Sequence, residues 1–262
     1  MNPALWVAKT GLDSQQTRLQ VVANNLANAS TTGFKKDRAV FEDLIYQNYK
    51  QPGAQSTQDS TLPSGLLLGT GVRVAGTQKM HLQGGFTHTG NSLDLAIQGQ
   101  GFFQVLRPDG TTAYTRDGEF QINEQGQVVT NDGYLLQPGI TIPANSTGIT
   151  IGTDGTVSVV EPGNGGVSTQ VGQIETSEFV NSSGLFPIGE NQFQETLSSG
   201  APTTGLPGLE GRGALLQGSL ESSNVNTVEE LVTLIETQRT FEMNSKSVST
   251  ADKMMSYFTN NV

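Results

Sequence analysis

The sequence predicts an α+β protein, with paired coiled-coil-like helices at its two ends and a glycine-rich, all-β middle. Apolar residues recur every seven positions near both ends, as along the seam of a coiled coil: Leu5, Leu12, Leu19 and Leu26 in the first run, and Leu234, Phe241, Val248 and Met255 in the last. Glycine makes up 32 of the 262 residues, about 12% against a usual share of about 7%. These glycines alternate with short apolar runs, which is typical of a turn-rich β-protein.

The first helix is expected to begin at Pro3 and to run to about Ala29. Asn2 suits the N-cap position, and a proline at the first helical position has a preset φ. Gly33 is expected to end this region with a positive φ. Val22 falls at the second seam position, so the predicted apolar stripe consists of Leu5, Leu12, Leu19, Val22 and Leu26.

The next segments are less regular. Apolar positions in residues 34–49 fit either a short second helix or an extended arm, and the sequence leaves both open. Residues 51–65 hold two prolines, two glycines and several Ser, Thr and Gln without periodicity. This composition predicts a surface loop or an arm that a partner orders.

From Gly71 onward the sequence predicts strands joined by tight turns. Residues 93–98 alternate between apolar and other side chains, and a further strand is expected at Phe103 and Val105. Four Asp-Gly pairs, at 109–110, 117–118, 132–133 and 154–155, are expected as hairpin turns. Proline and glycine at 138, 139 and 143 indicate the start of a smaller β unit, which strands around Ile174 and Phe179 are expected to close.

The last helix is expected to open at Thr227, with Glu230 completing a capping box. Its predicted interface consists of Leu231, Leu234, Ile235, Phe241, Val248 and Met255. The predicted domains are a terminal helical domain (1–45 and 218–262), an extended arm (46–70), a main β domain (71–138 and 185–217) and an inserted β domain (139–184).

The two helical ends have two possible uses. They can close on each other within one chain, as helices that cap a β domain do. However, burying the few large apolar groups of the first stripe does not offset the entropy lost in ordering about 25 residues. We therefore expect the ends to order when many copies assemble.

Composition argues against several classes of partner and chemistry. A net charge of −10 with 14 Lys and Arg argues against nucleic acid or an anionic membrane as partner. No run reaches the 18 or so apolar residues that span a bilayer, and Lys9, Asp13 and Arg18 make the first helix unlike a secretory signal. The chain has no cysteine. We expect no membrane insertion, no metal and no cofactor.

The sequence contains little that suggests catalysis. His81 and His88 lie among turn residues with no carboxylate at ligand spacing. Asp117 and Glu119, or Glu175 and Glu178, resemble the carboxylate pair of a glycosidase, but each lies beside a turn or on a polar strand face. We expect a protein that is not an enzyme; a cell-wall glycosidase or a β-rich adhesin remains as an alternative.

Residues 23–35, Ala-Asn-Asn-Leu-Ala-Asn-Ala-Ser-Thr-Thr-Gly-Phe-Lys, resemble the N-terminal signature of the bacterial flagellar rod and hook axial proteins. The family form usually has Val-Asn where this chain has Ala29-Ser30. Further matches lie at residues 93–103, 114–118 and 223–255, so the resemblance spans nearly the whole chain. Within the family, residues 11–18, 38–46 and 51–71 resemble the distal rod subunits; a proximal rod or hook subunit is the alternative.

The resemblance implies a rigid helical homopolymer in which the terminal helices line an inner tube that transmits torque across the periplasm and conducts exported subunits. The implied partners are the proximal rod subunits, the hook protein, the L-ring and P-ring proteins and the flagellar type III export apparatus, with export without a cleaved signal peptide. Asn24, Asn25 and Asn28 are expected to bridge neighbouring subunits. The arm, with Gln51, Pro52, Gln55, Leu62 and Pro63, is expected to link subunits and to keep the rod straight.

Overall fold

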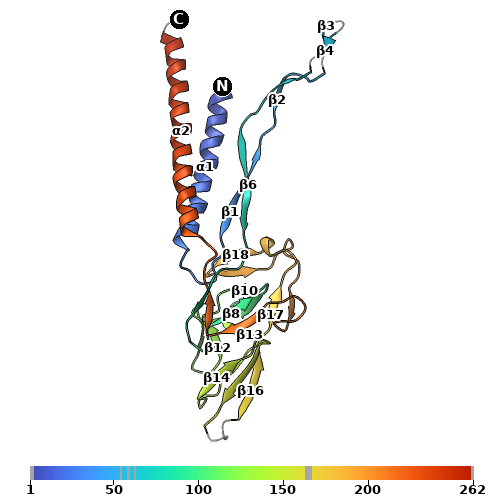
Figure 1. Ribbon diagram of the computed structural model, residues 1–262, viewed down its shortest axis with the longest axis vertical. Helices are drawn as coiled ribbons and strands as arrows, with labels where there is room; N and C mark the ends of the chain where they lie inside the picture. Colours follow the sequence, from blue (N-terminus) through green and yellow to red (C-terminus); the bar gives the residue numbers. More distant parts are fainter. Residues whose placement is uncertain (1–2, 54, 58–59, 62, 163–166, 261–262) are drawn as a thin grey trace. The chain divides into compact units, whose positions relative to one another are not determined.

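The computed structural model describes residues 3–53, 55–57, 60–61, 63–162 and 167–260. The chain divides into two compact units (Figure 1). We call Met1–Ala27, Asp37–Gln78 and Asn226–Val262 the helical unit, and Asn28–Lys36 and Lys79–Val225 the β unit. The predicted α+β class, with terminal helices and a β-rich middle, is confirmed. The finer four-domain division of the sequence stays a prediction.

The helical unit contains two long helices, α1 (Pro3–Ala27) and α2 (Thr227–Asn260), which pack side by side. They are antiparallel, because Asn25 bonds to Glu230 while Gly11, earlier in α1, lies against Asn244, later in α2. Helix α1 ends two residues before the expected Ala29, and Gly33 has the predicted positive φ, 70°. The proposed N-cap residue Asn2 lies outside the described residues. Neither helix, in its described part, is long and apolar enough to cross a membrane.

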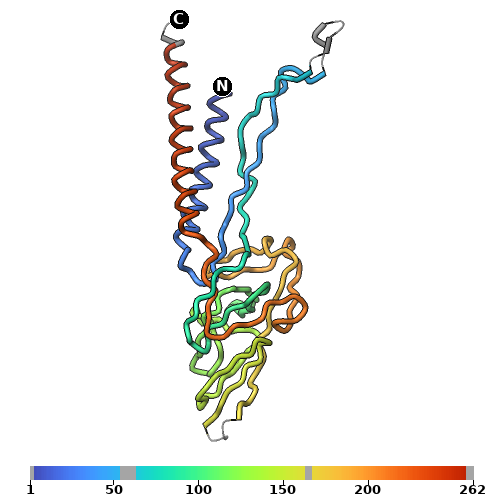
Figure 2. Tube along the Cα trace, viewed as in Figure 1, coloured from blue at the N-terminus to red at the C-terminus, as the bar shows by residue number. Residues whose placement is uncertain are grey.

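The rest of the helical unit is a two-stranded ribbon, which Figure 2 traces outward and back. Its strands pair as β1 (Asp37–Asp43) with β6 (Val72–Lys79), β2 (Gln47–Lys50) with β5 (Leu66–Leu68), and β3 (Gln55–Thr57) with β4 (Ser60–Thr61). The alternative that the sequence left open is settled, because residues 37–43 and 47–50 are strands and not helix. The expected arm residue Leu62 lies outside the described residues.

The β unit contains a nine-stranded sheet and several smaller pairings. The path through the large sheet is β11-β12-β13-β9-β10-β19-β18, with β17 pairing both β9 and β20. Its strands are β9 (Phe102–Leu106), β10 (Thr112–Thr115), β11 (Phe120–Ile122), β12 (Val128–Thr130), β13 (Leu135–Gln137), β17 (Thr176–Glu178), β18 (Phe186–Gly189), β19 (Gln192–Gln194) and β20 (Thr203–Gly205).

A three-stranded antiparallel sheet and two strand pairs complete the β unit. The sheet has the order β14 (Gly148–Ile151), β15 (Thr156–Val160), β16 (Ser168–Gln173), and the pairs are β8 (Leu95–Gln98) with β21 (Ala214–Gln217) and β7 (Phe86–His88) with β22 (Ser219–Glu221). A short 3₁₀ helix, η1, spans Ser182–Gly184.

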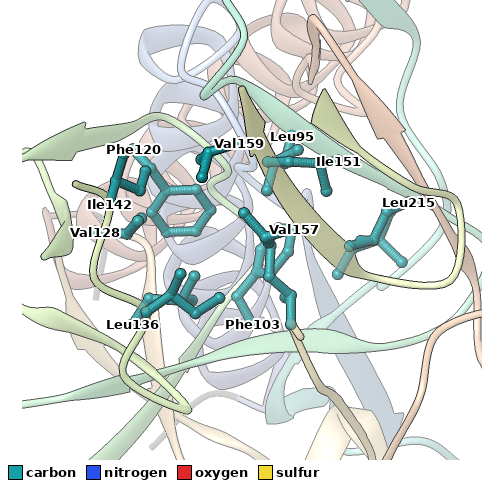
Figure 3. Packing of buried hydrophobic residues seen from close by; sticks show 13 residues of the cluster. Leu95, Phe103, Phe120, Val128, Leu136, Ile142, Ile151, Val157, Val159 and Leu215 are labelled. Atoms are coloured by element: carbon teal, nitrogen blue, oxygen red, sulfur yellow. The ribbon is translucent and has the colours of Figure 1, made fainter. Parts of the chain in front are cut away.

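The main core of the β unit joins the large and the small sheet. Figure 3 shows side chains from both pointing toward one another, among them Phe103 and Leu136 of the large sheet and Val157 of the small one. The Phe103 and Phe120 rings meet edge to face with centroids 5.2 Å apart. A second cluster contains Phe102, Tyr114, Phe179, Leu185 and Phe193. Phe103 and Phe120 both belong to the large sheet, so aliphatic side chains such as Val157 join the small sheet to it.

Three local predictions need correction. Asp109, Asp132 and Asp154 do open hairpin turns, but Asp117-Gly118 lies between β10 and β11, which do not pair. Gly118 instead lies against the Leu95 carbonyl, so this segment is a connection between strands that are not neighbours. The strand beside Phe179 belongs to the large sheet, and β16, just before Ile174, closes the small one.

The third correction concerns the start of α2. Asn226 Oδ1 accepts hydrogen bonds from the amides of Val228 at 3.1 Å and Glu229 at 3.4 Å, so Asn226 and not Thr227 is the N-cap. Glu230 does not close a capping box. Its carboxylate accepts a hydrogen bond from the side chain of Asn25 instead.

Candidate assembly surfaces

The seam between α1 and α2 is made mostly of small and polar side chains. Its buried residues are Ser14, Val22 and Asn25 on α1 and Glu230 and Thr237 on α2. The Ser14 and Thr237 hydroxyls donate to carbonyls of their own helices, at 2.8 and 2.7 Å. Hydroxyls satisfied in this way let the helices approach without leaving an unpaired buried polar group.

Asn25 ties the two helices to the base of the ribbon. Its Nδ2 donates to the Asp37 carbonyl at 2.9 Å and to Glu230 Oε2 at 3.3 Å, and its Oδ1 accepts from the Asp37 amide at 2.9 Å. Asn25 is 1% exposed. Its amide is therefore used within one chain, and the inter-subunit bridging expected of Asn24 and Asn28 stays a prediction.

The predicted helix interface separates into half-buried and exposed positions. Leu5, Leu12, Leu19 and Leu26 on α1 are half-buried, as are Leu234 and Val248 on α2. In contrast, the exposed fractions on α2 are 46% for Leu231, 48% for Ile235, 40% for Phe241 and 46% for Met255. Val228 and Val232, which the prediction left out, are exposed beside Leu231. A soluble chain rarely displays so many large apolar side chains on one helix unless another surface covers them.

The ribbon also displays apolar side chains. Ile45, Tyr46 and Tyr49 are exposed on the outgoing side, and Leu66–Leu68 on the returning side. Gln51, Pro52 and Pro63 are exposed near the tip. The arm prediction missed the tyrosines and leucines because it relied on loop composition. The sequence signal that could have identified them is the group of apolar residues on either side of the polar loop.

The β unit contains a buried ion network that the sequence did not suggest. Lys35 Nζ lies 2.5 Å from Glu221 Oε1, and Arg116 Nη1 lies 3.4 Å from Glu221 Oε2, with all three side chains at most 4% exposed. Lys35 also donates to the Leu82 carbonyl, and Arg116 to the carbonyls of Ile97 and Gly99. Burial lowers the pKa of Lys35, although the Glu221 carboxylate opposes that change. One carboxylate thus holds two cations from distant parts of the sequence.

Two further groups in the β unit titrate abnormally. Burial, with help from the positive charges of Lys35 and Arg116, lowers the pKa of His81 to about 4. Burial, reinforced by nearby carboxylates, raises the pKa of Asp117 to about 6. The imidazole of His81 packs edge-on against Phe102 and Phe193. His81 is therefore neutral at pH 7, and it packs against aromatic residues of the second cluster. Among the described residues, no three His, Asp or Glu side chains are grouped to hold a metal ion.

Comparison with known proteins finds three family models that match segments of this chain. Residues 5–35 match the flagella basal body rod protein model, residues 96–159 the flagellar hook protein FlgE/F/G D1 domain, and residues 216–262 the flagellar basal body rod FlgEFG protein C-terminal model. All three matched segments lie in elements described above. The first and last contain most of α1 and all of α2.

Individual relatives extend the match over the whole chain. The flagellar basal-body rod protein FlgG of Buchnera aphidicola is 54% identical over 258 residues, covering 97% of this chain and 98% of the relative. FlgG of Caulobacter vibrioides is 49% identical over 253 residues, covering 96% of each chain. The rod protein FlgF of Caulobacter vibrioides is 38% identical over 253 residues, covering 94% of this chain and 92% of the relative. This chain therefore belongs to the family of flagellar basal-body rod proteins, and it is similar to the FlgG members over nearly its full length.

Proposed function

We propose that this chain is the structural subunit of the distal rod and that it polymerises through α1 and α2 into a rigid tube. The observation that supports this most directly is the exposed apolar face of α2, on a chain similar to FlgG rod proteins over nearly its full length. Burying such a face against other copies releases the hydrophobic free energy that a single chain leaves unused. The higher identity to FlgG than to FlgF within one organism favours the distal rod over another rod position.

The tube would transmit torque across the periplasm and conduct exported subunits. Its expected neighbours are the proximal rod subunits, the hook protein and the L-ring and P-ring proteins. We infer that α1 is retained in the exported subunit, because residues 5–35 match the rod model and α1 packs against α2. Export would then follow the flagellar type III route without cleavage of this helix.

Electron microscopy of the concentrated, purified chain tests the proposal. We expect straight tubes in negative stain. The variant Leu231→Glu places a charge in the exposed apolar face and should leave monomers, whereas Leu209→Glu, at an exposed apolar position of the β unit, should not disturb helix packing. Wild-type protein that stays monomeric at every concentration, with helical circular dichroism intact, would contradict the proposal.

A second experiment tests the ribbon. We propose that its outer part, residues 51–65, contacts neighbouring subunits and keeps the rod straight. Gln51, Pro52 and Pro63 of this part are exposed, and so are Tyr46 and Tyr49 just before it. They support the proposal, because an isolated two-stranded ribbon gains little stability in water and needs a covering surface. Deletion of residues 51–65 should give curved or irregular polymers. Straight polymers from the deletion variant would contradict the proposal that residues 51–65 keep the rod straight.

A further inference from the structure

The helical unit contains an apolar groove between α1 and the ribbon. It has a volume of about 800 Å³ and is lined by Ala4, Val7, Ala8 and Gly11 of α1, by residues 68–72 of the ribbon and, at one edge, by Asn244 of α2. Trp6 contributes to its rim and is 45% exposed. None of the residues that line the groove carries a charge. Such a groove fits an apolar helix face better than a polar ligand.

Close backbone approach builds this groove. Gly71 has a φ of 118°, and a Cβ at that position would collide with the Thr10 side chain. The Val72 amide donates to Thr10 Oγ1 at 3.4 Å, which holds the ribbon against α1. On the other side, a Cβ on Gly11 would lie 3.2 Å from Asn244 Nδ2 of α2. Gly71 thus lets the ribbon approach α1, and Gly11 lets α2 approach α1 at the edge of the groove.

A matching surface lies at the start of α2. Val228, Leu231, Val232 and Ile235 are 46 to 68% exposed, and they occur at positions i, i+3, i+4 and i+7. We call these four residues the α2 stripe. This spacing places them on one face, the pattern by which an amphipathic helix enters a groove. The stripe and the α1 wall of the groove each extend over about two helical turns, or roughly 11 to 12 Å.

The stripe cannot reach the groove of its own chain. Asn25 meets Glu230 and Gly11 meets Asn244, so the groove lies level with residues 244–252 of α2. The stripe is about 25 Å away along α2 at 1.5 Å per residue. It also lies on the side of α2 away from Glu230 and Thr237, which face α1. Contact between stripe and groove therefore requires two copies.

Charge favours the same pairing. The segments that form the groove, residues 3–11 and 66–73, contain Lys9 and Arg73 and no acidic residue. The stripe segment, residues 228–236, contains Glu229, Glu230 and Glu236 and no basic residue. Arg73 pairs with Glu42, and Glu230 is buried against Asn25. Lys9 lies over the Trp6 ring at the rim of the groove, 5.7 Å from the ring centroid. Lys9 and Glu236 are both exposed and opposite in charge, and they are the pair whose alignment across the contact can be tested.

We propose that the α2 stripe of one copy occupies the groove between α1 and the ribbon of the next copy. This rests on the proposed polymerisation and names the two surfaces that perform it. Because the two surfaces differ, the contact is heterologous, and its repetition gives an open helical assembly instead of a closed dimer. Each added copy brings a new groove and a new stripe, so growth can continue.

Disulfide cross-linking of the full chain tests the contact, since the natural sequence has no cysteine. Val7→Cys and Ile235→Cys variants would be mixed, assembled and oxidised. We expect a disulfide-linked dimer only under assembling conditions. Val7→Cys mixed with Leu209→Cys is the control, because Leu209 is similarly exposed but lies in the β unit. Circular dichroism of each variant checks that it is folded.

Trp6 gives a second readout because it is the single tryptophan of the chain. Filling the groove should shift its emission to shorter wavelength on assembly, and Ile235→Glu should abolish the shift. Lys9→Glu and Glu236→Lys should each raise the critical concentration about threefold, the scale of one exposed ion pair. The double variant should recover the wild-type value.

The outcomes separate the two proposals. Tubes with the Val7–Ile235 cross-link and the Trp6 shift support both. Tubes without this cross-link, or with equal cross-linking of the Leu209 control, overturn the stripe-in-groove contact and leave polymerisation standing. Wild-type protein that forms no polymer overturns both.

Discussion

The two units of this protein distribute their apolar residues in opposite ways. In the β unit, Phe103, Val105, Leu136 and Val159 are completely buried. In the described part of the helical unit, Val22 is the only apolar side chain that is buried. The buried positions of the seam between α1 and α2 are mostly polar, and large apolar side chains of α2 such as Leu231, Ile235 and Phe241 are exposed. The β unit thus has its own core, whereas the helical unit displays the surface that further copies would cover.

The difference concerns where the free energy of burial is obtained. The β unit obtains it within one chain, through a core to which the large and the small sheet both contribute. The helical unit, which includes the ribbon, keeps many large apolar side chains exposed, so much of its free energy of burial is available only on association. This division fits the proposed polymerisation, because the β unit has its own core and the helices display apolar side chains for other copies to cover. The following predictions test this contrast, from the largest expected effect on the single chain to the smallest.

Phe103→Ala should lower the free energy of unfolding of the β unit by about 3–5 kcal/mol, because it opens a cavity beside Phe120. Ile122→Ala is the control; Ile122 is 42% exposed on β11, so its loss should cost less than about 1 kcal/mol. Urea unfolding followed by near-ultraviolet circular dichroism measures both. Equal losses would mean that the β unit does not depend on this core.

Glu221→Gln should lower the free energy of unfolding by about 3 kcal/mol, because it leaves Lys35 and Arg116 buried without a countercharge. Glu210→Gln is a matched control. Glu210 also lies 2.5 Å from a cation, Arg212, but its side chain is 76% exposed, so we expect at most about 1 kcal/mol. Thermal unfolding of the two variants gives the comparison, and a larger loss for Glu210→Gln would contradict the assigned role of burial.

His81 and Asp117 should give opposite pH dependences. The pKa of His81 falls from 6.5 to about 4 on folding, so the unfolded state binds more protons and stability decreases as pH falls from about 6.5 to 4. The pKa of Asp117 rises from 3.8 to about 6, so the folded state binds more protons and stability decreases as pH rises from about 4 to 6. Each contribution is at most roughly 3 kcal/mol, and together they nearly cancel.

Single variants separate the two contributions. Relative to wild type, Asp117→Asn should lose stability on acidification, and His81→Gln should lose it on raising the pH from 4 to 6. Urea unfolding at pH 4, 5, 6 and 7 measures these differences. Parallel curves for the wild type and both variants would show that neither group has the shifted pKa.

Asn226→Ala should destabilise α2 by about 1 kcal/mol, because it removes the side-chain cap of the Val228 and Glu229 amides. Thr227→Ala should have a smaller effect, since Asn226 occupies the capping position. Far-ultraviolet circular dichroism during thermal unfolding reports on the helix. A larger loss of helix stability in Thr227→Ala than in Asn226→Ala would support the capping box that the sequence predicted.

Leu231→Ser should change the stability of the single chain by no more than about 0.5 kcal/mol, because Leu231 is already 46% exposed. The same change should strongly reduce polymerisation, which sedimentation measures. Thr237→Val, in the buried seam, is the contrasting variant, because it alters the contact between α1 and α2 within one chain. A large loss of monomer stability in Leu231→Ser would mean that this face is covered within the chain.

Much of the secondary structure followed from local chemistry. Pro3 starts α1, Gly33 has the predicted positive φ, and three of the four Asp-Gly pairs form hairpin turns. The failures have a common cause. Asp117-Gly118 has the composition of a hairpin turn, but its neighbouring strands pair with others. Turn chemistry acts over four residues, whereas strand pairing depends on contacts between distant parts of the chain.

The candidate surfaces were less predictable than the helices that present them. The predicted interface on α2 included the exposed Leu231 and Ile235, but its heptad run also included Leu234, which is half-buried. Periodicity gives the positions on a helix and not the partner that each face meets. The groove could not be predicted at all, because it needs Gly71 of the ribbon against Thr10 of α1.

The sequence by itself determined the helical ends, the β-rich middle and, through its motifs, the resemblance to the rod and hook proteins. Periodicity, caps and turn residues act locally, so they can be read along the chain. Only the tertiary structure decided that Asn25 joins Glu230, that Lys35 and Arg116 share Glu221, and that the apolar side of α2 faces outward. These features depend on which distant segments of the chain meet. Burial sets the free energy of each charged and apolar group, and a group becomes buried only when those segments have packed together.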